Sequence, residues 1–340
     1  MIDLVVAGGG PAGLATAIHA ARAGLDTVVI EKRTGPIDKA CGEGLMPHAV
    51  RQLRLLGAQP AGRHFRGVAY LDEKRCVTAP FDGGSGLGVR RRTLHAALLA
   101  EADRAGVTLV HDKAGPVTQD AGSVTVNGIR ARYLAAADGL HSPIRGALGL
   151  ELPAGRTRRW GLKRHITVPP WSDVVEVYWS GRSEAGEAYV TPVADDCVGI
   201  AILTSRQGRF DQHLTAFPAL RERIEGLPHA PDRAAGPLRQ RVRSRVAGRV
   251  LLVGDAAGYV DALTGEGLGL SFAAARLLVD AVIADRPADY ERRWRSATRR
   301  YRLMTAGMLH ASTSPLRSLI VPAAGGLPRV FTGAVNLLAD

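Results

Sequence analysis

The chain has 340 residues, which exceeds one small core and suits about two domains. Hydrophobic residues at 46% and charged residues at 22% exclude an intrinsically disordered protein and do not indicate a membrane-spanning one. The net charge of +12 is compatible with nucleic acid, an anionic membrane or acidic small molecules, but the basic residues are spread through 156–164, 239–249 and 291–302 without zinc-finger or RNA-motif spacing, so we expect no nucleic-acid partner.

The three cysteines at 41, 76 and 197 lie far apart and form no C-x-x-C pair. This pattern argues against a disulfide framework and a structural zinc site, so we expect no metal and a reducing, cytoplasmic location. The first apolar run begins at Ile2, which leaves no room for a signal segment. No uncharged run reaches the ~18 residues that a membrane span needs.

The first thirty residues predict a β-α-β unit. The apolar run 2–7 is typical of a buried parallel strand, and an alanine-rich helix follows to about Ala23, where Gly24 ends it. A second strand, 27–30, stops at Glu31. A unit of this size is typical of a dinucleotide-binding fold.

The turn between the first strand and the helix carries a G-x-G-x-x-G pattern at residues 8, 10 and 13. Glycines let the backbone approach a pyrophosphate, whose charge the helix N-terminus stabilises, and an acidic residue after the second strand can bind ribose hydroxyls. We expect cofactor contacts from this unit at Gly8, Gly10, Pro11, Ala12, Gly13, Glu31 and Lys32.

The rest of the chain alternates between two patterns. Helices are predicted at 48–56, 92–104 and 267–284, and strands at 107–111, 123–126, 133–137 and 250–253. Alternating or β-branched runs at 65–87 and 160–205 are typical of an antiparallel sheet. We therefore predict a discontinuous nucleotide domain (1–64, 88–150 and 245–300), an antiparallel-sheet substrate domain (65–87 and 151–244) and a C-terminal helical tail (301–340).

Two later motifs identify the nucleotide by resemblance. Asp138-Gly139 follows a predicted strand, and Gly254-Asp255 precedes a Thr-Gly-Glu-Gly-Leu-Gly run at 264–269. Together they resemble the DG and GD motifs of the p-hydroxybenzoate hydroxylase-like flavoprotein superfamily. The resemblance implies FAD and an α/β fold: a three-layer Rossmann-type FAD-binding domain with an inserted antiparallel sheet. It implies further cofactor contacts at Asp138, Gly139, Asp255, Gly265, Glu266, Gly267 and Leu268.

Two other segments extend the resemblance. Arg91 matches an R-x-x-[LF] position that implies a cation near the cofactor phosphates. The segment 39–47, Lys-Ala-Cys-Gly-Glu-Gly-Leu-Met-Pro, resembles the C-G-x-G-L motif of the geranylgeranyl reductase-like branch, which implies contacts at Cys41 and Gly42. Ala262 stands where typical hydroxylases have a proline.

The candidate catalytic residues are Cys41, Glu43 and Tyr189. A thiol or a carboxyl beside a flavin can tune it or relay a proton, although a free cysteine is as often a small hydrophobe. Tyr189 and the proline at 192 retain part of an aromatic substrate motif of the reductases, but its tryptophan is missing, which argues against an isoprenoid reductase. His48, His64 and His165 are further candidate acids or bases.

Three functions remain open at this point. The first, slightly favoured, is an FAD-dependent monooxygenase that hydroxylates or epoxidises a lipophilic substrate through a flavin hydroperoxide, with NAD(P)H as reductant. The second is a flavin-dependent C=C reductase, and the third is a non-catalytic flavin-binding protein. The tail from about Ser314 is compatible with packing on the protein, which is favoured, or with peripheral membrane contact.

Overall fold

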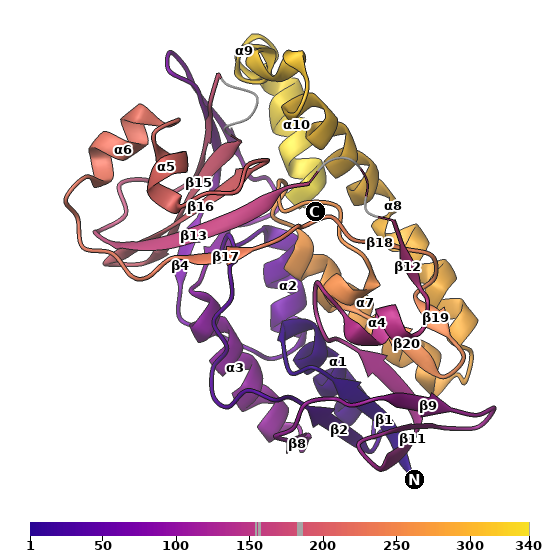
Figure 1. The fold of residues 1–340 in the computed structure, drawn as a ribbon. Helices are drawn as coiled ribbons and strands as arrows, with labels where there is room; N and C mark the ends of the chain where they lie inside the picture. The colour runs from indigo at the N-terminus through magenta and orange to yellow at the C-terminus, as the bar shows by residue number, and fades with distance from the viewer. Residues whose placement is uncertain (154, 156–157, 182–185, 340) are drawn as a thin grey trace.

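The computed structural model describes residues 1–153, 155, 158–181 and 186–339. The described residues form two large sheets, one near the N-terminus and one at the opposite end of the molecule (Figure 1). A long helix, α8 (Pro287–Ser312), runs along one side and connects the two ends. The α/β fold class predicted from the sequence is confirmed.

The first sheet is mostly parallel and has the strand order β19-β20-β11-β1-β2-β8, with the pair β9-β10 attached to β11. Strand β1 pairs in parallel with β2 on one side and with β11 on the other. The strands have these bounds: β1 Ile2–Ala7, β2 Thr27–Ile30, β8 Thr108–Val110, β9 Val117–Gln119, β10 Val124–Val126, β11 Ile129–Ala136, β19 Val246–Ala247 and β20 Val250–Leu252.

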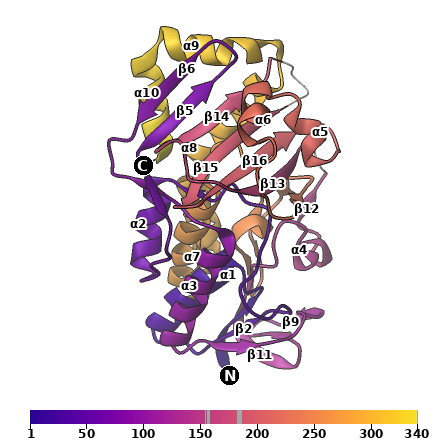
Figure 2. The same ribbon diagram turned by 90° about the vertical axis from the view of Figure 1, so that its left-hand side faces the viewer.

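Helices α1 (Pro11–Arg22), α3 (Arg91–Arg104) and α7 (Gly267–Ile283) pack together beside this sheet (Figure 2). The central strand β1 is buried from Leu4 to Ala7, and these apolar side chains form one core with the buried faces of the three helices. This explains the near-continuous hydrophobic run of the strand, because a parallel strand is covered on both faces.

The second sheet has seven strands in the order β17-β13-β16-β15-β14-β5-β6. All of its pairs are antiparallel except β14 with β5, which joins residues 67–71 to a strand more than one hundred positions later in the chain. The bounds are β5 Gly67–Leu71, β6 Cys76–Pro80, β13 Trp160–Thr167, β14 Val175–Trp179, β15 Glu187–Ala194, β16 Cys197–Thr204 and β17 Arg233–Ala235.

Smaller elements connect the two sheets. Strands β3 (Gly44–Leu45), β7 (Gly86–Gly88) and β4 (Arg63–Phe65) form a short sheet, and β12 (Glu151–Leu152) pairs with β18 (Arg241–Val242). The remaining short helices are α2 Pro47–Leu55, α4 Pro143–Ala147, α5 Phe210–Leu214, α6 Pro218–Ile224 and the 3₁₀ turn η1 Gly254–Ala257.

The C-terminal segment is helical, as predicted. After α8 come η2 (Pro315–Leu319), α9 (Ile320–Gly326) and α10 (Pro328–Ala339), and α9 and α10 pack against β6. Helix α8 continues without a break across residue 300, where the sequence analysis drew a boundary. The continuity follows from the absence of proline and glycine between Ala288 and Ala306.

Candidate functional site

One cavity of about 1210 Å³ extends between the two sheets and receives side chains from both. Most of the residues that the sequence singled out line it, although they come from segments far apart in the chain. These residues are Gly8, Gly10, Pro11, Ala12, Glu31, Lys32, Cys41, Gly42, Glu43, Arg91, Asp138, Gly139, Tyr189, Asp255, Gly265, Gly267 and Leu268.

Two of the expected cofactor contacts do not line the cavity. Gly13 packs below the turn, where a Cβ atom would lie 1.9 Å from the carbonyl oxygen of Gly8. Glu266 is buried, its Oε1 has no hydrogen-bond partner among the described residues, and burial raises its pKa to about 8. Gly13 therefore lets the start of α1 pack closely against the turn that follows β1. Glu266 is a buried carboxylic acid outside the cavity lining, and its raised pKa favours the neutral form.

The turn at the start of α1 is built for close approach to a ligand. Gly8 has φ 107°, and a Cβ there would lie 2.5 Å from the Ala137 carbonyl oxygen. Gly10 precedes the helix and has no atom within 4 Å of an added Cβ, so its backbone is open to the cavity. An exposed helix N-terminus framed by glycines fits a diphosphate.

Glu31 stands at the end of β2, beside this turn. Its Oε2 accepts a hydrogen bond from the Gly9 N–H at 2.9 Å, and its Oε1 accepts one from Arg33 Nε at 2.8 Å. Burial disfavours the charged form, but the hydrogen bonds from Arg33 and Gly9 hold the pKa of Glu31 below its ordinary value. The carboxylate is thus fixed and charged where a ribose would need an acceptor.

A histidine that the sequence analysis did not single out supports the same turn. His95, on α3, contacts the Gly9 carbonyl oxygen through Nε2 at 2.7 Å, and its Nδ1 accepts a hydrogen bond from the Ile37 N–H at 3.3 Å. Burial lowers the pKa of His95, which favours the neutral imidazole that can do both. No motif marks this contact, because α3 reaches the turn only in the folded chain.

Unpaired polar atoms also point to a bound group. Asp138 Oδ1 and Arg91 Nε are buried without a hydrogen-bond partner among the described residues, and both side chains line the cavity. Buried polar atoms are nearly always paired in folded proteins. The donor at Arg91 and the open glycine turn fit the anionic, hydroxyl-bearing body of FAD.

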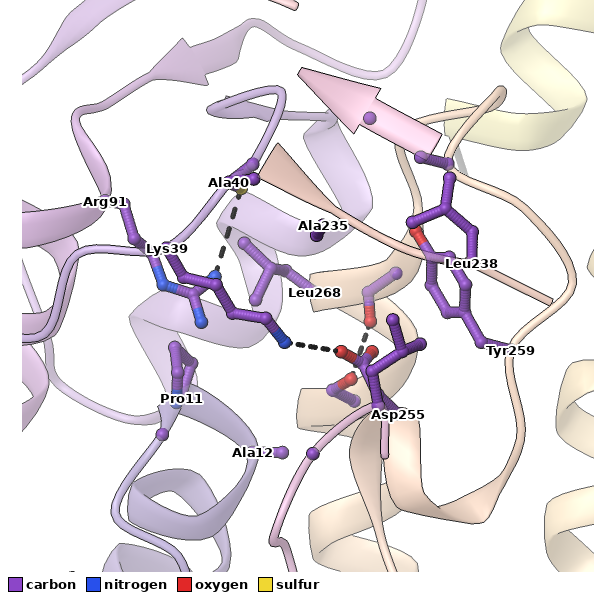
Figure 3. A pocket seen from close by; sticks show the side chains of 18 of the residues that line it. Pro11, Ala12, Lys39, Ala40, Arg91, Ala235, Leu238, Asp255, Tyr259 and Leu268 are labelled. Atoms are coloured by element: carbon purple, nitrogen blue, oxygen red, sulfur yellow. Dashed lines mark hydrogen bonds and ion pairs between the residues drawn. The ribbon is translucent and has the colours of Figure 1, made fainter. Parts of the chain in front are cut away.

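A salt bridge crosses the cavity between Lys39 and Asp255. Figure 3 shows Lys39 and Arg91 pointing into the same space, with Lys39 Nζ 3.1 Å from Asp255 Oδ2. Both side chains of the bridge are about one third exposed, so its partners can exchange for other charged groups. Lys39 was missed, because a loop lysine has no distinguishing pattern.

Glu43 is the centre of a buried charged cluster. Its Oε1 accepts hydrogen bonds from the Arg91 N–H at 2.7 Å and from Lys163 Nζ at 3.0 Å, and its Oε2 lies 2.5 Å from His165 Nε2. Burial disfavours its charge, yet His165 and Lys163 hold the pKa of Glu43 below its ordinary value. Lys163 Nζ also donates to Asp38 Oδ1 at 3.1 Å and itself lines the cavity.

Cys41 lies beside this cluster. Its Sγ accepts a hydrogen bond from the Glu43 N–H at 3.4 Å and lies 3.9 Å from Arg91 Nη1, a contact drawn in Figure 3. The thiol is partly exposed to the cavity. Cys41 and Glu43 therefore share one loop, and Lys163 of β13 joins them only through the tertiary fold.

Two hydroxyls on the wall formed by β15 are already engaged. Tyr189 Oη donates to the Leu263 carbonyl oxygen at 2.9 Å, and Thr191 Oγ1 donates to the Gly42 carbonyl oxygen at 2.9 Å. Each bond ties the sheet to a loop that lines the cavity. The sequence pointed to Tyr189 but not to this anchoring contact.

The candidate histidines differ in position. His165 contacts Glu43 from behind the wall, and His64 contacts the Gly86 carbonyl oxygen at 3.2 Å in the short sheet. His48 lies on α2 beside Gly269, where its ring is 2.9 Å from the position of an added Cβ. None of the three belongs to the described residues that line the cavity.

Comparison with known proteins extends these observations. The profile of the FAD binding domain family matches residues 1–285. A menaquinone reductase of Mycobacterium tuberculosis is 30% identical over 308 residues, which cover 82% of this chain and 76% of the relative. A digeranylgeranylglycerophospholipid reductase of Methanothermobacter thermautotrophicus is 27% identical over 340 residues, covering 86% of this chain and 81% of the relative.

Solved structures show the same fold. A geranylgeranyl bacteriochlorophyll reductase-like protein of Thermoplasma acidophilum has a TM-score of 0.81 at 22% identity, covering 94% of this chain and 90% of the other. The p-nitrophenol 4-monooxygenase of Pseudomonas putida has a TM-score of 0.82 at 18% identity, covering 100% of this chain and 98% of the other. These likenesses establish the fold and leave the reaction open.

Proposed function

The chain belongs to the FAD-binding domain family of FAD-dependent oxidoreductases, and we propose that it reduces a carbon–carbon double bond in a lipophilic, unsaturated small molecule. NAD(P)H as the source of electrons is part of this proposal. The residues that line the cavity at the glycine turn, at Arg91 and at Asp138 would hold FAD, and bound FAD supplies the electrons for the reduction.

The size and lining of the cavity carry the proposal. A volume of about 1210 Å³ exceeds the roughly 300–1,000 Å³ of an ordinary small-molecule pocket, so a cofactor and a substrate can share it. The half of the cavity that lies mainly along the second sheet and the C-terminal helix is mainly apolar, and we call it the substrate half. It is lined by Phe65, Val68, Tyr70, Val175, Val177, Leu203, Leu238, Val335 and Leu338.

The polar groups on the sheet wall favour an apolar substrate. The hydroxyls of Tyr189 and Thr191 already donate to backbone carbonyls, so they can only accept a hydrogen bond from a substrate. A hydrocarbon chain can bind in this part of the cavity without a desolvation cost for unpaired polar groups, because it has none. Together with the apolar side chains that line this half of the cavity, this supports a mainly apolar substrate.

The sequence alone slightly favoured monooxygenation over C=C reduction. In our proposal the relatives favour C=C reduction instead. The menaquinone reductase and the digeranylgeranylglycerophospholipid reductase match 82% and 86% of the chain at 30% and 27% identity, and a dialkyldecalin synthase of Streptomyces rugosporus matches 78% of it at 27%. The monooxygenase resembles the chain in fold at 18% identity. Four residues of the C-G-x-G-L segment, Cys41, Gly42, Glu43 and Gly44, line the cavity and support the same choice.

We assign the proton chemistry to side chains on the wall. Saturation of a double bond needs a proton at one carbon, and Cys41 Sγ and Lys163 Nζ are proton-bearing groups that line the cavity. Glu43 holds both in place through its backbone N–H and its carboxylate. Tyr189 and Thr191 act as positioning residues that fix the loops at Leu263 and Gly42.

The experiment is anaerobic turnover of the FAD-loaded enzyme with NADPH and either menaquinone or a polyprenyl alcohol. We expect a product in which one C=C bond is saturated, with two added hydrogens and carbon-bound deuterium incorporated from heavy water. A menaquinone reduced only to its quinol does not count as this product. Cys41→Ala should slow product formation, while Cys76→Ala, at an exposed cysteine away from the cavity, should not. Turnover that stops without O₂, with labelled oxygen from O₂ in the product, would instead establish the second candidate, monooxygenation.

A further inference from the structure

Exposed apolar side chains gather at the C-terminal end of the chain. Nine large apolar side chains are exposed among the described residues, and six of them lie between positions 303 and 337. Five belong to η2, to α10 or to the junction between α9 and α10, and we call the four that are more than half exposed the tail face: Leu316 (57% exposed), Leu319 (56%), Leu327 (58%) and Val330 (65%).

The tail face covers the end of the molecule remote from the N-terminus. Helices α9 and α10 lie at that end in both views, with α10 beside α8 in Figure 1 and beside β6 in Figure 2. Within the part of the chain that the structure describes, no single helix has the length and hydropathy to cross a bilayer. The pair Pro315–Gly326 and Pro328–Ala339 meets those criteria only together, and it bends by 105°.

The opposite side of α10 is fixed to the protein. Asn336 accepts a hydrogen bond from the Asp82 N–H at 2.9 Å and donates one to the Pro80 carbonyl oxygen at 3.0 Å. Val335 is buried and lines the substrate half of the cavity together with Leu338. One helix thus faces the cavity on one side and carries exposed apolar groups on the other.

The charge of the same segment is one-sided. Residues 292–339 contain eight arginines, at 292, 293, 295, 299, 300, 302, 317 and 329, and no lysine, aspartate or glutamate. Arg317 is buried and donates to the carbonyl oxygens of Ser180 and Ser312, whereas the other seven are exposed. Arg292, Arg293 and Arg295 pair with Asp289, Asp280 and Glu291 near the start of α8, so the arginines that adjoin the tail are Arg300 and Arg329. Arg300 donates to the Leu337 carbonyl oxygen of α10, and Arg329 is next to Val330.

We propose that the tail face binds an anionic lipid bilayer, with η2, α9 and α10 lying in the interface and Arg300 and Arg329 meeting the headgroups. Apolar side chains rimmed by arginine are typical of surfaces that lie in a membrane interface, and the bend and the anchored inner side argue for lying on the bilayer. In this arrangement α10 separates the bilayer from the substrate half of the cavity. If the proposed function holds, a lipid substrate enters the cavity beside α10.

The test is co-sedimentation of the full-length, FAD-loaded protein with vesicles of phosphatidylcholine alone or mixed equally with phosphatidylglycerol. We expect binding to the anionic vesicles that weakens with added salt. The variant Leu316→Ser/Leu319→Ser/Leu327→Ser/Val330→Ser should bind roughly tenfold less or weaker still. The control Leu55→Ser/Ile283→Ser, at equally apolar sites that are 55% and 52% exposed elsewhere, should bind as the wild type does.

Absence of binding to anionic vesicles, or equal binding by the fourfold variant, would overturn the proposal. A wild-type dimer that the fourfold variant converts to a monomer without vesicles would overturn it too, since the face would then meet a second copy. Retained flavin absorbance shows that each variant is folded. Turnover of detergent-solubilised substrate tests the proposed function separately, because it requires no bilayer.

Discussion

Glu43 adopts φ 61°, in the left-handed region that non-glycine residues rarely occupy, while its side chain is only 1% exposed. A buried charge in an unfavourable backbone conformation persists only when the surroundings hold it there. The Arg91 N–H, Lys163 and His165 supply those contacts. The residue therefore holds the loop of Cys41 against β13.

Replacing this carboxylate should cost stability at neutral pH. Glu43→Gln keeps the shape but removes the charge opposite Lys163, so we expect the free energy of unfolding to fall by roughly 3 kcal/mol. Because the pKa of Glu43 is lowered in the folded state, its contribution is present above the ordinary value of 4.5 and is lost as the pH falls through the folded pKa. The difference from wild type in urea unfolding should thus shrink in acid. Glu73→Gln, at an exposed glutamate, is the control.

Glu266 should show the reverse pH dependence. Burial raises its pKa from 4.5 to about 8, so the folded protein holds a proton that the unfolded chain releases between these values. The stability of the wild type relative to Glu266→Gln should fall as the pH rises through this window, by up to roughly 5 kcal/mol. Thermal melts of both proteins from pH 5 to pH 9 measure it, and parallel curves would contradict the shift.

At the scale of elements, we propose that the turn between β1 and α1 holds FAD. Gly8→Ala places a Cβ 2.5 Å from the Ala137 carbonyl oxygen at φ 107°, so the turn must move. We expect a strain of about 2 kcal/mol and FAD binding weaker by roughly thirtyfold, measured by titration of flavin fluorescence. Gly307→Ala, in α8 with open space around its Cβ, should bind FAD normally.

The attachment of α10 to β6 gives a second prediction at this scale. Asn336→Ala leaves the Asp82 N–H and the Pro80 carbonyl without their partner, which should cost about 1–3 kcal/mol. Amide hydrogen exchange should accelerate in 328–339 and around Asp82, while the exchange of β1 stays unchanged. Unchanged exchange in α10 would mean that its apolar contacts alone hold it.

For the whole molecule, the cavity lies between the two sheets and exists only when both are folded. A cofactor that binds there should therefore raise the free energy of unfolding of the whole protein. FAD that binds only the folded chain should stabilise it by about 2.7 kcal/mol at a concentration one hundred times its dissociation constant. Differential scanning fluorimetry should register a concentration-dependent rise in Tm for the wild type. Gly8→Ala should require much more FAD for the same rise in Tm. An equal rise in both proteins would contradict the proposed contact between the turn and FAD.

The sequence predicted those parts of the site that lie within one local element. The glycine turn, Glu31 at the end of β2 and Asp138 after β11 all line the cavity, because strand, turn and helix patterns place them at the same edge of a parallel sheet. Lys163 and His95 were missed as partners. Lys163 reaches Glu43 across 120 positions and His95 reaches Gly9 across 86, distances that no local pattern spans.

By itself, the amino-acid sequence determined the fold class and predicted a glycine turn of the dinucleotide-binding type, because short-range periodicity and glycine spacing dictate where the backbone turns. The resemblance of the motifs at Asp138 and Asp255 indicated the FAD-binding family, which the match over residues 1–285 confirms. The tertiary structure decided what surrounds the substrate half: the pairing of β5 with β14, the buried cluster at Glu43 and the docking of α10 over the cavity. Those features depend on packing between distant segments, and it is the geometry of the folded chain that brings their side chains together.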